Sequence, residues 1–372
     1  ILQGKIKPNL YKRANYMPCQ ATAKVTFIRS GVKQEKVDKV GLILTNPSFI
    51  FIKSFYTKGL TAFFNEVISD QMHTKIELST MCFYHGDTLT KIKQCRDYIE
   101  SKGFEFGIQL HNSVTKDLYN KIKDLDVGFS VHAPVFSDYF INLANNDFNT
   151  VLAGFQNTAS VMQSLRCNVA LFHGFFMTQK PIKNDPANYG KVLRDAMDNN
   201  YRLNDTRVMD PKFLETDEFK NYQNTVKENM KQLRERYPSY TLCIENDFPG
   251  IGNGNQTPAH LIYLDCPIWL DAGHLWASAI LNKFDFYTGI DTICKQCQVI
   301  GAHLNTNRTP LNWNFKSPDG DTHSHFSREC DMDMDRVISI LKKNLITHFT
   351  TEVVDGDIED VTFLIEAYQS II

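Results

Sequence analysis

Short apolar runs alternate with amphipathic stretches along most of the chain after residue 73. Eight of these runs have the length and apolar content of strands that are buried on both faces, at residues 75–80, 104–110, 127–131, 169–172, 241–244, 267–270, 298–302 and 346–351. The stretches between them repeat apolar residues at helical spacing, for example at 88–101, 115–124, 150–165, 218–236 and 332–343. Strands that alternate with helices in this way are typical of an α/β fold with a parallel sheet.

The number of strand–helix units indicates which α/β fold to expect. Eight units after residue 73 predict a (β/α)8 TIM barrel, although a doubly wound sheet would show the same alternation. Ionisable side chains follow most of the predicted strands. Only a closed barrel brings all the strand ends to one mouth, so these side chains favour the barrel.

One connection is longer than a single crossover helix requires. It runs from His173 to Thr241. The sequence therefore predicts an insertion after the fourth strand, at residues 174–240, with at least one extra helix on the face that carries the ionisable side chains. Its polar, Asn-rich composition fits a lid, a surface that faces the substrate, or a loop without a function of its own.

Residues 1–72 lack the rhythm of the remainder and are predicted to form an N-terminal addition to a barrel domain of residues 73–372. Strands are plausible at 23–28, 40–45 and 48–55, and a short helix at 59–69. The addition holds eleven Lys or Arg and four Asp or Glu, a net charge of +7, whereas the remainder holds 29 and 38, a net charge of −9. This asymmetry is typical of a basic arm that contacts nucleic acid, and equally of a solvated appendage.

Composition narrows the class of protein. Of the 372 residues, 42% are apolar and 22% charged, as in ordinary globular proteins. No apolar run approaches the roughly 20 residues of a membrane span, and no signal peptide is visible, so we expect an intracellular protein, cytoplasmic or nuclear, that does not bind membranes. Nine Cys at irregular spacing predict reduced thiols rather than a disulfide framework. The Cys294-x-x-Cys297 pair has no second pair beside it, which favours buried thiols over a zinc or redox site.

Carboxylates and imidazoles follow the third to the eighth predicted strand. In chain order, these candidate metal ligands are His132, His173, Glu245, Asp271, His274, His303, Asp321, His323 and Glu352. A single His at a strand end is more often a structural residue than a ligand. Core packing, however, does not require such a residue at six successive strand ends, and burying so many ionisable groups without counter-charge would be costly. Bound metal ions would remove that cost.

The ligand types indicate which metal to expect. Imidazole and carboxylate without thiolate suit Zn²⁺, with Mn²⁺ or Fe²⁺ as alternatives at some sites. Zinc takes about four ligands including water, so this set exceeds one ion and suffices for about three if one carboxylate bridges. We expect Asp271 at the tip of the sixth strand and His274 in the loop just beyond it. His325 is an alternative to His323.

In order and placement, these motifs resemble those of the endonuclease IV family of apurinic/apyrimidinic (AP) endonucleases, also called AP endonuclease family 2. Its members are trinuclear zinc enzymes on a (β/α)8 barrel of the xylose-isomerase-like superfamily. The resemblance covers about residues 73–372 and rests on VHAP at 131–134, INLA at 141–144, FHG at 172–174, IEN at 244–246, LDAGH at 270–274, HLN at 303–305, DTH at 321–323 and TE at 351–352.

The resemblance implies a role for each ligand. One zinc ion would be held by His132, His173 and Glu245, a second by Glu245, Asp271, His303 and Glu352, and a third by His274, Asp321 and His323. Glu245 and Glu352 would be catalytic, with Glu352 orienting the attacking water. The glycines Gly250, Gly252 and Gly254 resemble the family's Gly-rich loop.

The implied activity is that of a base excision repair nuclease. The enzyme would incise double-stranded DNA 5′ of abasic sites and leave a 3′-hydroxyl and a 5′-deoxyribose phosphate. It would act as a monomer without an obligate protein partner. The loop at 110–114 departs from the family because it has no Arg where a basic DNA-penetrating segment is usual. The family's aromatic residue near His132 is displaced or replaced, since Ala133, Pro134, Val135 and Phe136 come before Tyr139. These departures leave the ligands intact.

Two other functions stay open at the level of the sequence. A divalent-metal sugar isomerase or epimerase of the xylose-isomerase-like group would use Glu245, Asp271, His303 and Glu352, but would not need the remaining ligands. A non-catalytic DNA-binding or structural protein would not need any of them.

Overall fold

The computed structural model of the protein describes residues 74–371, apart from residues 205 and 316–320. The chain divides into two units, Ile1–Ser69 and Asp70–Ile372, and the second contains all the described residues. The strands, the helix and the basic arm that the sequence predicts within residues 1–72 lie outside the described residues.

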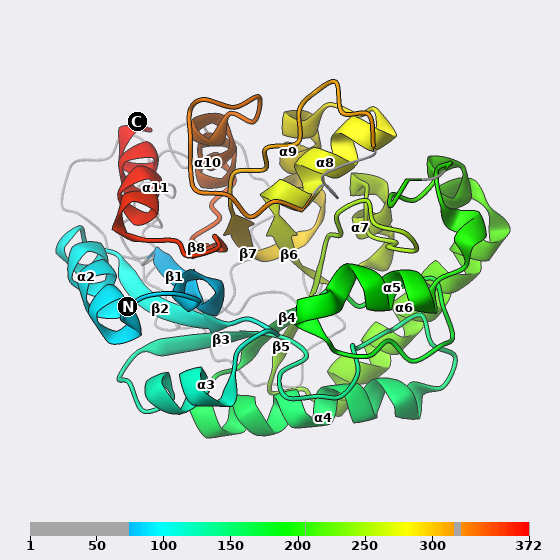
Figure 1. Cartoon of the computed structure of the whole chain (residues 1–372), viewed down its shortest axis with the longest axis horizontal. Coiled ribbons are helices and arrows are strands. Elements are labelled where there is room, and N and C mark those ends of the chain that lie inside the picture. The colour runs from blue at the N-terminus through cyan, green and yellow to red at the C-terminus, as the bar shows by residue number, and fades with distance from the viewer. Residues whose placement is uncertain (1–73, 205, 316–320, 372) are drawn as a thin grey trace, which may run out of the picture. The chain divides into compact units, whose positions relative to one another are not determined.

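A closed barrel of parallel strands, paired in chain order from β1 to β8, forms the centre of the fold (Figure 1). The strands are β1 Lys75–Ser79, β2 Glu105–Leu110, β3 Gly128–His132, β4 Val169–Phe172, β5 Thr241–Glu245, β6 Pro267–Asp271, β7 Gln298–Leu304 and β8 His348–Thr351. Most of their residues are buried, as expected of strands with helices outside and side chains inside the barrel. The predicted (β/α)8 TIM barrel is confirmed.

Helices surround the barrel and complete its units (Figure 1). They are α2 Thr88–Ser101, α3 Lys116–Ile122, α4 Phe148–Leu165, α6 Asp217–Arg236, α7 Pro258–Leu264, α8 Ala272–Asn282, α9 Phe286–Gln296, α10 Met334–Lys343 and α11 Ile358–Ser370. Helix α4 begins two residues before its predicted start, because the Asp147 carboxylate accepts from the backbone N–H of Asn149 and caps the helix there. Asp333 caps α10 in the same way, so that helix begins two residues later than predicted.

The long connection after β4 contains the predicted extra helix. Helix α5 spans Tyr189–Ala196, and short 3-10 turns lie at Pro186–Asn188, Asn199–Tyr201 and Pro211–Glu215 before α6 begins. The connection is tied to the Gly-rich loop after β5, because Val208 pairs with Gly250 in an isolated antiparallel bridge. The insertion is therefore attached to the end of the barrel where β5 terminates.

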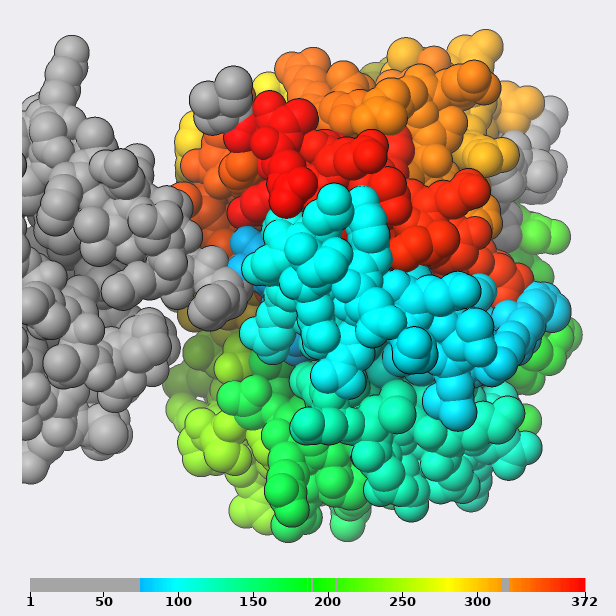
Figure 2. All heavy atoms as spheres, turned by 90° about the vertical axis from the view of Figure 1, so that its left-hand side faces the viewer, coloured from blue at the N-terminus to red at the C-terminus, as the bar shows by residue number. Residues whose placement is uncertain are grey.

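Closure of the barrel brings its first and last units together. Figure 2 shows residues of α2, in cyan, beside residues of α11, in red. Tyr368 of α11 packs edge-on against Phe104, with ring centroids 5.6 Å apart, and against Phe349 of β8 at 5.7 Å. Among the described helices, none is long and apolar enough to cross a membrane.

Apolar and polar side chains are both buried among the strands of the barrel. Leu171, Cys243 and Trp269 form a small buried cluster of their own. Gly301 makes room for the Trp269 ring, since a Cβ at that position would lie 2.6 Å from Cη2. Glu77 of β1 and Gln109 of β2 are polar side chains that are also fully buried. A polar layer thus lies inside the barrel, below the strand ends.

Candidate metal centre

The carboxyl ends of β3 to β8 deliver the predicted ligands to one place. They form three groups in which each residue offers a ligand atom and these atoms lie within 4.8 Å of one another. The groups are His132, His173 and Glu245; Glu245, Asp271, His303 and Glu352; and His274, Asp321 and His323. Called here the first, second and third groups, they include all nine predicted ligands, with Glu245 shared between the first and the second.

Glu245 joins the first group to the second through its two oxygens. Its Oε2 lies 3.1 Å from His132 Nε2 and 3.8 Å from His173 Nδ1. Its Oε1 lies 2.6 Å from His303 Nδ1. The side chain is fully buried. A bridging carboxylate between two cations requires this arrangement, with one oxygen directed to each ligand set.

Glu352 completes the second group directly after β8, the strand that pairs with β7. Its Oε2 lies 3.0 Å from His303 Nδ1, and its Oε1 lies 3.3 Å from His132 Nδ1. Asp271 Oδ2 lies 3.6 Å from the same His303 nitrogen. Glu352 therefore lies between His303 of the second group and His132 of the first.

The third group lies beside the first two. Asp321 Oδ1 lies 2.5 Å from His323 Nε2 and 3.3 Å from His274 Nε2. The prediction that His274 lies in a loop is wrong, because it lies in the first turn of α8. Asp271 Oδ1 caps that helix by accepting from the backbone N–H of His274 at 2.6 Å. The cap fixes the spacing between a residue of the second group and a residue of the third.

Backbone carbonyls orient both imidazoles of the third group. His274 Nδ1 donates to the carbonyl of Asn246 at 3.0 Å, and His323 Nδ1 donates to that of Glu352 at 3.0 Å. Each ring therefore directs Nε2 towards Asp321, and that nitrogen can bind a cation once it has lost its proton. Outer hydrogen bonds that fix the tautomer in this way are usual for histidines that bind metals.

The charges of the three groups depend on one another. Burial would raise the pKa of Glu245, but the imidazoles of His303, His132 and His173 hold it well below its usual value. Burial would lower the pKa of His323, but the Asp321 carboxylate raises it to about 9. In the absence of a cation, protonated imidazoles thus neutralise the carboxylates.

This arrangement predicts a pH dependence that zinc should change. An unfolded imidazole titrates near about 6.5, whereas His323 titrates at about 9 in the folded protein. Protonated His323 therefore stabilises the folded state fully below the pKa of the unfolded imidazole. This stabilisation is lost as pH rises towards the pKa of His323 in the folded protein. We expect the unfolding temperature of chelator-treated protein to fall over this interval, and the rise caused by added zinc to grow over it, because zinc displaces the proton.

Thermal unfolding followed with and without zinc across this pH range measures both effects. His323→Gln should lose most of the pH-dependent zinc effect. His325→Gln is the matched control and should keep it, because His325 lies outside the three groups and pairs with Asp360. If zinc raised the unfolding temperature of wild type equally at both ends of this pH range, the assignment of His323 as a ligand of the third group would be wrong.

Several facing atoms are suited to a cation. Four of them, His132 Nε2, Glu245 Oε2, His274 Nε2 and Glu352 Oε2, are buried and face a charged group at ion-pair distance, but make no well-oriented hydrogen bond among the described residues. Buried polar atoms are rarely left so. The donor set of imidazole nitrogens and carboxylate oxygens also matches zinc. The residues present therefore fit metal ions, and their role as ligands stays a prediction.

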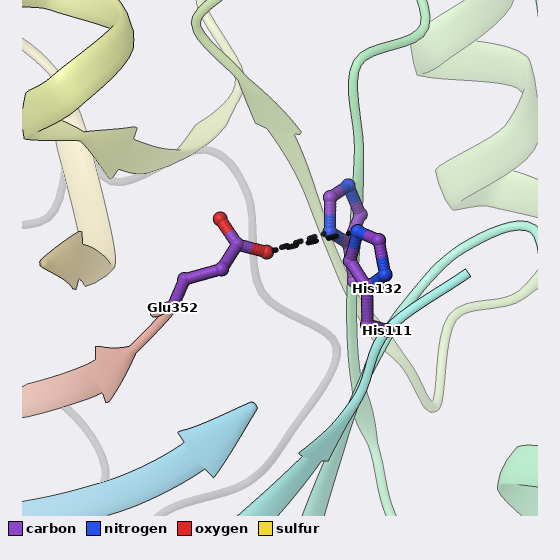
Figure 3. Close-up of side chains that lie close together, drawn as sticks. All are labelled: His111, His132 and Glu352. Carbon is purple, nitrogen blue, oxygen red and sulfur yellow. Dashed lines mark hydrogen bonds and ion pairs between the residues drawn. The ribbon is translucent and has the colours of Figure 1, made fainter. Parts of the chain in front are cut away.

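Sequence reasoning missed two side chains at this centre. His111, directly after β2, forms a further group with His132 and Glu352 (Figure 3). Its ring stands edge-on to His132 with centroids 5.0 Å apart, and its Nε2 lies 3.9 Å from Glu352 Oε1. Burial and the charge of His132 lower the pKa of His111 to about 3, so the ring is neutral. The sequence could have indicated His111 as a candidate ligand, since it directly follows a predicted strand as several of the other candidates do.

Asp247 is the second missed residue. It is fully buried, and its Oδ1 lies 2.9 Å from His173 Nδ1. Burial raises the pKa of Asp247 despite this imidazole. The same nitrogen of His173 lies 3.8 Å from Glu245 Oε2, so Asp247 approaches the His173 ring on the side that faces the first group. Because Asp247 comes two residues after Glu245, the sequence alone suggests only a turn residue.

Other candidates of the sequence lie elsewhere. His325 joins Asp357 and Asp360 instead of the third group. All eight Cys in the described residues are free, and none of them belongs to a candidate metal group. Burial raises the pKa of Cys294 to about 12 and that of Cys297 to about 11. Cys294 and Cys297 are both partly exposed, and the preference for reduced thiols over a zinc or redox pair stays a prediction.

The Gly-rich loop packs against the start of the insertion. The backbone N–H of Gly254 donates to the carbonyl of Phe175 at 3.1 Å. A Cβ on Gly254 would lie 2.3 Å from the Phe175 side-chain ring, so only glycine fits there. Gly252 has φ of +76°, and its carbonyl accepts from Met177 at 2.8 Å. The loop therefore supports the segment that follows His173.

Comparisons with known proteins identify the architecture. No family model and no curated protein matches the chain. A solved D-tagatose 3-epimerase-like protein is 14% identical, covers 80% of this chain and 96% of its own, and has a TM-score of 0.50. An L-ribulose 3-epimerase is 12% identical over 80% of this chain and 93% of its own length, with a TM-score of 0.44. An AP endonuclease of family 2 from Brucella melitensis is 12% identical over 80% of this chain and 99% of its own length, with a TM-score of 0.46. At such identities the likeness shows the fold alone.

Proposed function

We propose that this chain is a zinc-dependent phosphodiesterase that incises double-stranded DNA on the 5′ side of abasic sites. The products would be a 3′-hydroxyl and a 5′-deoxyribose phosphate, as in base excision repair. The observation that carries the proposal is the presence of the first and third groups beside the second. A sugar isomerase needs only the four residues of the second group, whereas all nine predicted ligands converge here.

Each group would hold one zinc ion, with Glu245 shared by the first two. Bound there, zinc would make hydroxide available near neutral pH and offset the negative charge of the phosphate. Glu352 would orient the attacking water, a role supported by the approach of its two oxygens to His132 in the first group and His303 in the second. Its pKa, which burial would raise, lies well below the usual value because of His303 and His132, so it is a hydrogen-bond acceptor.

The substrate must reach these residues from outside a duplex. The ligands follow the carboxyl ends of the strands, where (β/α)8 enzymes bind their substrates. An abasic nucleotide would have to be turned out of the helix to enter the mouth, and a missing base lowers the cost of unstacking. This cost difference supports abasic DNA as the substrate.

The alternative function is a divalent-metal sugar isomerase or epimerase. The second group, whose side chains are at most 1% exposed, provides the Glu, Asp, His and Glu that such an enzyme requires. Two of the similar solved structures are named as sugar epimerases or epimerase-like. The zinc content separates the two functions, since about three ions per chain support the nuclease and one or two support the isomerase.

Incision of a defined duplex tests the proposal. The full chain, loaded with zinc, is incubated with an end-labelled duplex that carries one tetrahydrofuran abasic analogue, and with the same duplex without it. We expect one incision, 5′ of the analogue, that a chelator abolishes and zinc restores. Failure of the zinc-loaded protein to incise either duplex would contradict the nuclease function.

A further inference from the structure

The imidazole of the second group is held differently from those of the third. His303 directs Nδ1 towards the ligands, whereas His274 and His323 direct Nε2. The Nε2 atom of His303 lies 2.6 Å from Oε1 of Gln109, a side chain of β2 that is fully buried. A side-chain amide thus takes the place of the backbone carbonyls that orient the other two rings.

The other end of the Gln109 amide donates to two hydroxyls. Its Nε2 lies 3.1 Å from Ser130 Oγ of β3 and 3.2 Å from Thr350 Oγ1 of β8. Both hydroxyls in turn lie against Oε2 of Glu77 in β1, at 2.5 Å for Ser130 and 3.2 Å for Thr350. All five side chains are fully buried, so water does not compete with these hydrogen bonds.

Glu77 determines the direction of every hydrogen bond in this chain of contacts. Its Oε1 lies 2.6 Å from Lys75 Nζ, and its Oε2 lies 3.0 Å from His348 Nε2. Burial would raise the pKa of Glu77, but Lys75 and His348 hold it far below the usual value. Glu77 is therefore ionised, and an ionised carboxylate can only accept hydrogen bonds.

Because Glu77 can only accept, it fixes which atoms donate and which accept in the hydrogen bonds that lead to His303. A hydroxyl that donates its proton to Glu77 has only acceptor capacity left, so Ser130 and Thr350 must accept from Gln109. The NH2 group of Gln109 therefore faces the hydroxyls, and its carbonyl oxygen faces His303. That oxygen needs a donor, so the proton of a neutral His303 ring is on Nε2 and the lone pair is on Nδ1.

We propose that Gln109 is a positioning residue that fixes the tautomer of His303 and turns its Nδ1 towards the second group. Glu77 sets the direction of this hydrogen bond through Ser130 and Thr350, without touching the ligands. The inference rests on the proposed metal centre. It adds to that centre a polar network inside the barrel that prepares one ligand before the metal binds.

Gln109→Met tests the proposal, because Met keeps the length of the side chain and removes both hydrogen-bonding ends. Zinc binding by the full chain is measured by competition with a chromophoric chelator. We expect the affinity at the second group to fall about 10- to 100-fold, the usual effect of removing such an outer partner. Gln223→Met is the matched control, since Gln223 is also a buried glutamine but lies on α6, outside the barrel. It should bind zinc as wild type does.

The ring nitrogens of His303 provide a readout that general destabilisation would not change. In zinc-loaded, ¹⁵N-histidine-labelled wild type, we expect the His303 ring to show a protonated Nε2 that is protected from solvent exchange. In Gln109→Met this protection should be lost. Ser130→Ala and Thr350→Val, which leave Gln109 in place, should weaken zinc binding less, and they provide the test if Gln109→Met does not fold.

The outcomes separate this inference from the proposed function. Neither measurement involves DNA, so a protein that binds zinc but does not incise DNA still tests the role of Gln109. Unchanged zinc affinity and an unchanged His303 tautomer in folded Gln109→Met would overturn the inference alone. A wild-type chain that binds no zinc would overturn both the inference and the proposed metal centre.

Discussion

Replacement of Glu245 by Gln is expected to abolish incision and to remove the zinc ions of two groups at once. Glu245 is the only residue shared by the first and second groups, and its two oxygens face His132 and His303 at 3.1 and 2.6 Å. An amide keeps the shape of the side chain but offers one neutral oxygen and an NH2 donor. That donor would point at an imidazole or at the cation itself.

The expected magnitude follows from the loss of charge at a fully buried position. Metal ions contribute several kcal/mol of charge stabilisation, and each 1.4 kcal/mol changes the rate about tenfold, so we expect incision to slow by about a thousand-fold or more. Bound zinc should fall from about three to about one ion per chain. Incision of the abasic duplex and metal analysis of the same sample measure both quantities.

A matched control is available on the surface. Glu366→Gln, at an exposed position of α11, makes the same chemical change away from the ligands and should keep wild-type activity and zinc content. If Glu245→Gln kept both incision and zinc, the assignment of Glu245 as a bridging ligand would be wrong.

Asp321→Asn is expected to remove one zinc ion and leave the other two. Asp321 belongs only to the third group, where its Oδ1 lies between His323 Nε2 and His274 Nε2. The first and second groups do not depend on it. If the third ion stabilises the departing 3′ oxygen, the loss should reduce kcat by about a hundred- to a thousand-fold, with a smaller effect on KM.

Metal analysis and steady-state kinetics of Asp321→Asn check this expectation together. Asp355→Asn is the control, because Asp355 is an acidic residue that pairs with His85 at 2.6 Å and does not belong to the three groups. A zinc count that stays at its wild-type value in Asp321→Asn would contradict the third site. Full incision activity with one ion fewer would contradict the role given to the third group in stabilising the departing oxygen.

The repeating units and the order of the candidate ligands could be predicted from the sequence. All eight strands form within about two residues of their predicted bounds, because apolar periodicity is a local property of the chain. Helix ends were less certain, since caps such as Asp147 and Asp333 decide them. The same reason explains the error at His274, whose helix begins directly after the capping residue Asp271.

The sequence by itself determined that carboxylates and imidazoles stand at the ends of six successive strands. Parallel strands in a closed barrel place those ends on one face, so convergence follows from the topology. The tertiary structure alone decided which side chains meet. It placed His323 rather than His325 beside Asp321, and it brought Gln109 to His303, which is 194 residues away in the chain. Such contacts depend on closure of the barrel and on the direction of each hydrogen bond, and neither is a local property of the sequence.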